Sequence, residues 1–181
     1  MTSTGQQMTV DADSFRAVMG HFATGVSVVT TCDGSQRQGI TVNAFCSVSL
    51  EPPLVLVCIE KTSHVHDAMR ASGVFAVNLL RADQEQFSTG FASNTEERRR
   101  DFCHVASHTV ATGAPVFDVS LGFADCRVVA MYPGGDHTIF LGRVEALGAF
   151  EGEPLLYYRS HYLHDLPTSR DRPAAENERA Q

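Results

Sequence analysis

The chain has 181 residues, a hydrophobic content of 43% and a formal net charge of -7, which suit one globular domain with a substantial core. No apolar run reaches the roughly 20 residues of a membrane-spanning helix, and the opening segment lacks the basic and apolar regions of a signal peptide. An acidic chain with a single lysine, Lys61, is a poor binder of nucleic-acid phosphates. We therefore expect a cytoplasmic protein that contacts neither a membrane nor nucleic acid.

The cysteines are odd in number and scattered along the chain, and no C-x-x-C pair occurs among Cys32, Cys46, Cys58, Cys103 and Cys126. This pattern is typical of small buried hydrophobic residues in a reducing compartment. Histidines are numerous, but none stands in an H-E-x-x-H motif and no cysteine lies at ligand spacing, so we expect no metal site.

The chain begins with an amphipathic helix that leads into a hairpin. Asp13 or Ser14 is suited to cap this helix, and Thr24-Gly25 is expected to end it. Residues on its apolar face recur at the helical spacing, namely Phe15, Val18, Met19 and Phe22. A strand of alternating residues follows from Val26 to Thr31, and Asp33-Gly34 is a strong hairpin signal.

The segment from Gly39 to Leu54 is unusual for a buried strand. It starts with an alternating pattern, continues with small and hydroxylated residues, and stops at Pro52-Pro53, which cannot donate ladder hydrogen bonds. Small side chains would let a flat ligand approach the backbone. The side chains able to donate hydrogen bonds to such a ligand are Thr41, Asn43, Ser47 and Ser49. Composition alone favours a simpler interpretation, an edge strand with a polar face.

A second candidate site follows the apolar strand Leu54–Ile59. A short helix is predicted from Val65 to Ala71, capped by Thr62 or Ser63. A strand end, a lysine, two hydroxyls and a helix N-terminus together favour an anion such as phosphate. The residues concerned are Lys61, Thr62, Ser63 and His64. A capped helix beside an exposed lysine explains the same residues equally well.

The rest of the chain is predicted to be mostly β-structure. A strand covers Val74–Leu80, Asp83 caps a helix that ends at Phe91, and a last strand covers Leu155–Arg159; a long hairpin joins Leu121–Tyr132 to His137–Phe150. Six or seven strands, two or three short helices and no βαβ repeat predict a mainly β fold, a closed antiparallel barrel.

Common catalytic and nucleotide-binding motifs are absent. The sequence holds neither G-x-G-x-x-G nor the P-loop pattern, and no G-x-S-x-G elbow supports a serine hydrolase. His137 follows Gly134-Gly135-Asp136 at the tip of the long hairpin. Taken alone, it is most simply a turn histidine in solvent.

Several segments resemble one family. Gly39–Phe45 (GITVNAF) and Ser47–Leu54 (SVSLEPPL) look like the signature of the flavin reductase-like, FMN-binding split-barrel family. Further segments resemble the family in the same order, over roughly residues 15–162: Phe15–Val26, Phe75–Leu80 and Gly135–Val144. Members of this family are short-chain NAD(P)H:flavin oxidoreductases that supply reduced flavin to two-component monooxygenases.

The resemblance implies a flavin reductase-type split β-barrel with a few short helices. We place this domain at residues 13–166, between a flexible N-terminus (1–12) and a tail (167–181) whose polar, mixed-charge composition predicts mobility. The resemblance also implies a homodimer that binds FAD or FMN and takes NADH, with NADPH possible, and a separate monooxygenase that receives the reduced flavin. His137 is expected to contact the nicotinamide. The expected flavin-binding residues are Thr41, Asn43, Ala44, Phe45, Cys46, Ser47 and Ser49, with Lys61, Thr62, Ser63 and His64 at the phosphate and Tyr158 or Arg159 touching flavin or nucleotide.

Other proteins on the same barrel remain alternatives. A pyridoxamine-phosphate-oxidase-like enzyme would hold its flavin tightly and oxidise a bound amine. A non-enzymatic flavin-binding or haem-binding module would bind the cofactor without oxidising NADH, and a purely structural domain would bind neither.

Overall fold

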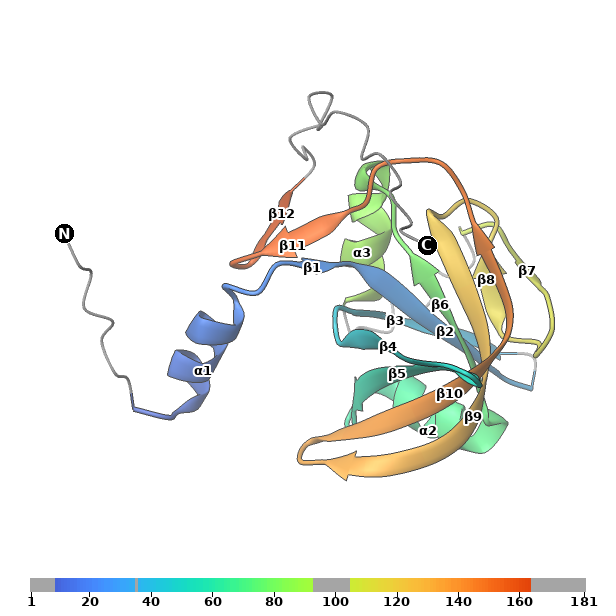
Figure 1. The fold of residues 1–181 in the computed structure, drawn as a ribbon, viewed down its shortest axis with the longest axis horizontal. Helices are drawn as coiled ribbons and strands as arrows, with labels where there is room; N and C mark the ends of the chain where they lie inside the picture. Colours follow the sequence, from blue (N-terminus) through green and yellow to red (C-terminus); the bar gives the residue numbers. More distant parts are fainter. Residues whose placement is uncertain (1–8, 35, 93–104, 164–181) are drawn as a thin grey trace, which may run out of the picture.

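The computed structural model describes residues 9–34, 36–92 and 105–163 (Figure 1). Its centre is a seven-stranded antiparallel sheet in the order β3-β2-β6-β9-β10-β5-β4. The bounds of these strands are β2 Ser27–Asp33, β3 Gln36–Val42, β4 Phe45–Leu50, β5 Pro53–Glu60, β6 Val74–Leu79, β9 Gly122–Gly134 and β10 His137–Ala149. The expected tail and Cys103 lie outside the described residues.

Two small sheets and three α-helices complete the described fold. One sheet joins β1 (Thr24–Gly25), β11 (Leu156–Tyr158) and β12 (His161–Leu163), and the other joins β7 (Ser107–Thr109) and β8 (Pro115–Phe117). The helices are α1 (Ala12–Met19), α2 (His64–Ser72) and α3 (Glu85–Phe91), the last preceded by the 3-10 turn η1 (Ala82–Gln84). The mainly β architecture is confirmed.

Helix α2 follows its predicted signals. The Ser63 hydroxyl accepts a hydrogen bond from the Val65 N–H at 3.2 Å, and Gly73 ends the helix with a φ of 67°, a left-handed conformation that favours glycine. Val65 and Met69 are fully buried in the main core, where they meet strand residues such as Val57, Phe75 and Phe140. The predicted helix and one of its two candidate caps are therefore confirmed.

Helix α1 differs from its prediction at both ends. Asp11, rather than Asp13 or Ser14, is the cap, because its carboxylate accepts hydrogen bonds from the N–H groups of both those residues, at 3.0 and 2.9 Å. The helix ends at Met19, and Thr24-Gly25 pairs with β11 as strand β1. In Figure 1 the helix stands away from the sheet.

The sheet has a break between two strands that are consecutive in the chain. Strands β3 and β4 lie at its two ends, and only Asn43-Ala44 separates them. The Phe45 N–H bonds locally to the Asn43 carbonyl at 3.0 Å, while the Ala44 carbonyl accepts from the Cys58 N–H at 3.0 Å. This turn carries the chain from one edge to the other. The expected closed barrel is not confirmed, because no ladder joins β3 to β4 among the described residues.

Candidate functional site

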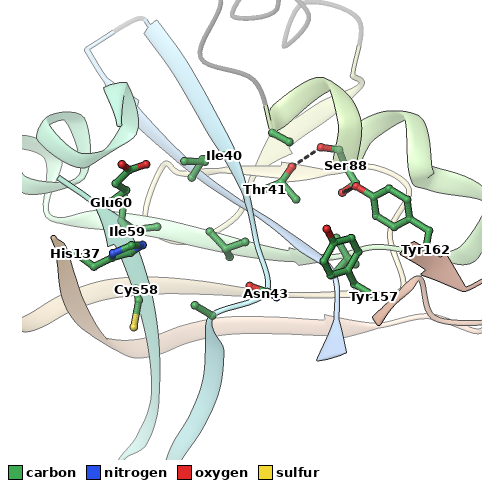
Figure 2. A pocket seen from close by; sticks show the side chains of 14 residues that line it. Ile40, Thr41, Asn43, Cys58, Ile59, Glu60, Ser88, His137, Tyr157 and Tyr162 are labelled. Atoms are coloured by element: carbon green, nitrogen blue, oxygen red, sulfur yellow. Dashed lines mark hydrogen bonds between the residues drawn. The ribbon is translucent and has the colours of Figure 1, made fainter. Parts of the chain in front are cut away.

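A cavity of about 350 Å³ lies beside the break in the sheet (Figure 2), within the range of about 300–1,000 Å³ typical of small-molecule sites. Asn43 and Ala44, the two residues that join β3 to β4, are part of its wall, and β5, α3, β10, β11 and β12 also contribute residues. The pocket therefore lies where the chain passes from one sheet edge to the other.

One end of the cavity is polar and charged. Glu60 and His137 are cross-strand partners at the ends of β5 and β10, and both line the cavity (Figure 2). His137 Nδ1 lies 2.7 Å from Asp136 Oδ1. This hydrogen bond is the main cause that lowers the pKa of the Asp136 carboxyl from its usual value. Since the carboxylate engages Nδ1, the other ring nitrogen, Nε2, is left for a ligand.

The hairpin that carries His137 is held by the segment after β5. The Lys61 N–H donates to the Asp136 carbonyl at 3.0 Å, and Lys61 Nζ donates to the Gly135 carbonyl at 2.5 Å. In this structure the only lysine of the chain thus contacts the backbone of the β9–β10 turn. These contacts fix the turn that precedes His137, and His137 itself pairs with Glu60 in the β5–β10 ladder.

The opposite end of the cavity is aromatic and hydroxylated. Tyr157 on β11 and Tyr162 on β12 are neighbours, with ring centroids 5.3 Å apart. The Tyr162 hydroxyl lies 2.8 Å from Ser88 Oγ on α3, and the Ser88 carbonyl accepts a hydrogen bond from Thr41 Oγ1 at 2.6 Å (Figure 2). Three separate elements therefore meet at Ser88.

The middle of the cavity combines a polar side chain with apolar neighbours. Asn43 is exposed, and its amide makes no hydrogen bond to any residue that the structure describes. Ile40 and Cys58 line the same region, and burial raises the pKa of the Cys58 thiol. A planar heterocycle with polar edges suits this lining, because an amide offers both a donor and an acceptor.

Four of the residues predicted for the site come together in this cavity, namely Thr41, Asn43, Ala44 and His137. Phe45 instead lines a neighbouring cavity of about 390 Å³, which also touches Asn43. Cys46 and Ser47 are exposed on β4, and Ser49 is half-buried there.

The predicted phosphate residues lie around the start of α2 and outside the cavity lining. Ser63 is buried as the helix cap, whereas Lys61 and Thr62 are exposed and His64 is half-buried. Their assignment to a phosphate stays a prediction.

The tyrosine of β11 that lines this cavity is not the one named in the sequence analysis, and the assignment of Tyr158 or Arg159 to the flavin or nucleotide stays a prediction. Tyr157 lines the cavity, and Tyr158 instead lies against His21, with ring centroids 6.3 Å apart. Arg159 is in the β11–β12 turn with a φ of 48°. Strand alternation places residues 157 and 158 on opposite faces, but the sequence alone does not reveal which face meets the cavity.

Glu60, Ser88 and Tyr162 are the other polar residues that the sequence analysis did not assign. Glu60 could have been predicted from the sequence, because it is opposite His137 if the strand that ends near Ile59 pairs with the strand that begins at His137. No three His, Cys, Asp or Glu side chains gather as a metal site within the described residues.

The structure therefore combines a mainly β fold with a cavity of small-molecule size beside the break in its sheet. The family comparison is specific: the model of the flavin reductase like domain matches residues 19–164, and the chain belongs to this family.

Relatives of known name agree with the family. The chain is 38% identical over 156 residues to the flavin-dependent monooxygenase reductase subunit HsaB of Mycobacterium tuberculosis, covering 84% of this chain and 82% of that protein. It is 44% identical over 158 residues to the flavin reductase (NADH) of Kitasatospora aureofaciens, covering 84% and 81%. Among solved structures, it is similar to Streptomyces globisporus NADH:FAD oxidoreductase SgcE6 in complex with NAD and FAD fragments, with a TM-score of 0.81 and 36% identity over 90% of this chain and 99% of that one.

Proposed function

We propose that this protein is an NADH-dependent flavin reductase that transfers hydride from NADH to FAD or FMN and releases the reduced flavin to a separate flavin-dependent monooxygenase. One observation carries the proposal. Thr41, Asn43 and His137 come from two family-like segments far apart in the sequence, and they line one cavity. The names of the relatives, an NADH-dependent reductase and the reductase subunit of a monooxygenase, support the same activity.

The reaction needs binding and orientation more than acid–base groups. NADH loses a hydride and becomes NAD⁺, while the flavin takes up that hydride at N5 together with a proton from solvent. The protein's part is to hold the two rings in contact. In this proposal Asn43 bonds a polar ring edge, and His137, whose Nδ1 contacts Asp136, bonds the nicotinamide; both residues line the cavity, which supports these roles.

The charge of the cavity favours NADH over NADPH. Glu60 contributes a carboxylate, and the described residues that line the cavity include neither lysine nor arginine. NADPH carries an additional phosphate on the adenosine ribose, and the described residues of the cavity lining offer that phosphate no cationic side chain.

The deciding experiment follows the loss of NADH absorbance without flavin, then with FMN and then with FAD. Turnover that requires added flavin is the expected result, and the preferred flavin is the one with the higher kcat/KM. Replacing NADH by NADPH should lower the rate. Oxidation of neither NADH nor NADPH with either flavin would refute the proposal. That result would favour a pyridoxamine-phosphate-oxidase-like enzyme or a cofactor-binding module.

We also propose that the protein is a homodimer that uses the apolar face of α1. Phe15 is 59% exposed and Phe22 is 76% exposed, and Leu50 at the end of the edge strand β4 is 96% exposed. A second copy would cover such residues. Light scattering should report twice the chain mass, and Phe15→Ser with Phe22→Ser should shift the protein towards monomer. A monomeric wild type would refute this assembly.

We propose that the protein acts in the cytoplasm. The described cysteines are all free thiols, as expected in a reducing compartment. No helix within the described residues is long and apolar enough to cross a membrane.

A further inference from the structure

The C-terminal hairpin β11–β12 reaches the cavity through two tyrosines and is tied to α3 by a polar contact. Ser88 is fully buried, yet it lines the cavity. Its hydroxyl bonds the Tyr162 hydroxyl at 2.8 Å, and its carbonyl accepts from Thr41 at 2.6 Å. A single helix residue thus joins two walls of the pocket that are far apart in the sequence.

The tyrosine pair has the properties of a stacking surface. Tyr157 and Tyr162 are both half-buried, and both line the cavity. Their rings are inclined at 60° with centroids 5.3 Å apart, so each ring restricts the rotation of the other. The Tyr157 hydroxyl makes no hydrogen bond to a described residue, whereas the Tyr162 hydroxyl is engaged by Ser88. Figure 2 shows both rings at the end of the pocket away from His137.

We propose that Tyr157 and Tyr162 form the surface on which a planar heterocyclic ring of a nucleotide substrate stacks, and that Ser88 is the positioning residue that holds this surface. Aromatic rings bind planar heterocycles through their faces, and a ring that is held in place loses less entropy on binding. The inference rests on the proposed flavin reductase activity, in which both the flavin and the nicotinamide nucleotide carry such rings.

The test compares Ser88→Ala, Tyr162→Phe, the double variant of the two, and Tyr157→Leu. Ser88→Ala removes the hydroxyl but keeps the carbonyl that binds Thr41, and Tyr162→Phe keeps the ring. Thr89→Ala is the matched control, because the Thr89 hydroxyl is exposed on the same helix and bonds the Glu85 carbonyl at 3.1 Å. The measurements are kcat and KM for the flavin and for NADH, and the Kd for FMN and for NADH by calorimetry.

Each single hydroxyl variant should raise KM and Kd for one substrate by about 2–10-fold, the loss expected for one hydrogen bond, while kcat changes less than about twofold. The double variant should be no worse than the poorer single variant, because both changes break the same bond. Tyr157→Leu should raise the same KM and Kd further. A rise for FMN would identify the flavin ring as the stacked group, and a rise for NADH would identify a ring of the nicotinamide nucleotide.

Unchanged KM and Kd for both substrates in Tyr157→Leu would overturn the proposal, even if the variants unfold at lower temperature. A double variant whose loss equals the product of the two single losses would also overturn the role of Ser88. If the wild type does not oxidise NADH with either flavin, the proposed activity fails, and the FMN and NADH titrations still decide whether the tyrosine surface binds a ring.

Discussion

Two asparagines of this fold show the difference between a residue used by the protein and one available to a ligand. Asn78 on β6 is fully buried. Its amide nitrogen donates to the Val28 carbonyl and to Thr30 Oγ1, each at 3.1 Å, and its side-chain oxygen accepts from the Phe117 N–H at 2.8 Å. Asn43 is exposed at the break in the sheet and has no such bonds to described residues.

The comparison teaches that polarity alone does not identify a binding residue. Both asparagines lie in segments that resemble the family, Phe75–Leu80 and Gly39–Phe45. What separates them is whether their hydrogen-bonding capacity is already used within the chain. Ser63 and Lys61 resemble Asn78 in this respect, because both make hydrogen bonds within the protein.

The largest effect is expected from Asn78→Ala. It leaves the buried Phe117 N–H and Val28 carbonyl without their side-chain partner and should lower the free energy of unfolding by about 3 kcal/mol. Asn43→Ala should change it by less than about 0.5 kcal/mol while raising the Kd for FMN. Urea unfolding and FMN titration measure the two effects. Similar losses in the free energy of unfolding in both variants would contradict the distinction between a structural Asn78 and a ligand-binding Asn43.

His137→Ala should reduce kcat/KM for NADH by about 10–100-fold, the value of a hydrogen bond to a substrate through an ionisable group. Asp136→Asn removes the carboxylate that orients His137 and should have a smaller effect in the same direction. Steady-state kinetics and FMN titration separate these roles. An unchanged KM for NADH and an unchanged kcat in His137→Ala would refute the assignment of His137 to the nicotinamide.

Lys61→Ala tests whether a residue that already bonds within the protein also binds a ligand. Lys61 is predicted to bind the flavin phosphate, and in the structure it contacts the Gly135 carbonyl. If it binds phosphate, the Kd for FMN should rise about tenfold, whereas the Kd for riboflavin, which lacks the phosphate, should stay constant. Equal changes for FMN and riboflavin would assign Lys61 to the Gly135 contact alone. Fluorescence titration with both flavins makes this measurement.

Glu60→Gln should change kcat/KM for NADH and for NADPH by the same factor, to within about twofold, because Glu60 pairs with His137 at the proposed nicotinamide end of the cavity and the two coenzymes differ only at the adenosine ribose. Glu51→Gln is the control for net charge, since Glu51 is exposed in the turn between β4 and β5 and outside the cavity lining. A ratio of the two kcat/KM values that changes in Glu60→Gln and not in Glu51→Gln would place the adenosine ribose, rather than the nicotinamide, at this end of the cavity.

The smallest effect concerns thiol reactivity. Burial raises the pKa of Cys126 to about 12, so iodoacetamide should leave it unmodified in the folded protein. Exposed Cys46 should react first. Cys58 lines the cavity, and its slow labelling should become slower with FMN bound. Mass spectrometry of peptides over time follows all three, and FMN-independent labelling of Cys58 would place the flavin elsewhere.

Much of this organisation is predictable from the sequence. The turn at Asp33-Gly34, the cap at Ser63 and the long β9–β10 hairpin have local signals, and the structure confirms them. Thr41, Asn43, Ala44 and His137 were expected in one site, and they line one cavity.

The remainder depends on contacts between distant segments. The sequence shows one strand beginning at Gly39, but the Asn43-Ala44 turn divides it, because β3 pairs with β2 and β4 pairs with β5. The helical pattern of α1 does not reveal that its apolar face is exposed. Ser88 had no local signal, since its role arises only where α3 meets β12.

The break in the sheet has a consequence for how this pocket tolerates change. Among the described residues, strands β3 and β4 each pair with one neighbour in the sheet, so a longer connection between them would shift the register of no central strand. An insertion at Asn43-Ala44 would alter the pocket wall while leaving the core around Phe75 and Phe140 in place. The stretch that shapes the ligand site can therefore gain residues without disturbing the central strands, which allows the site to vary in size within a constant scaffold.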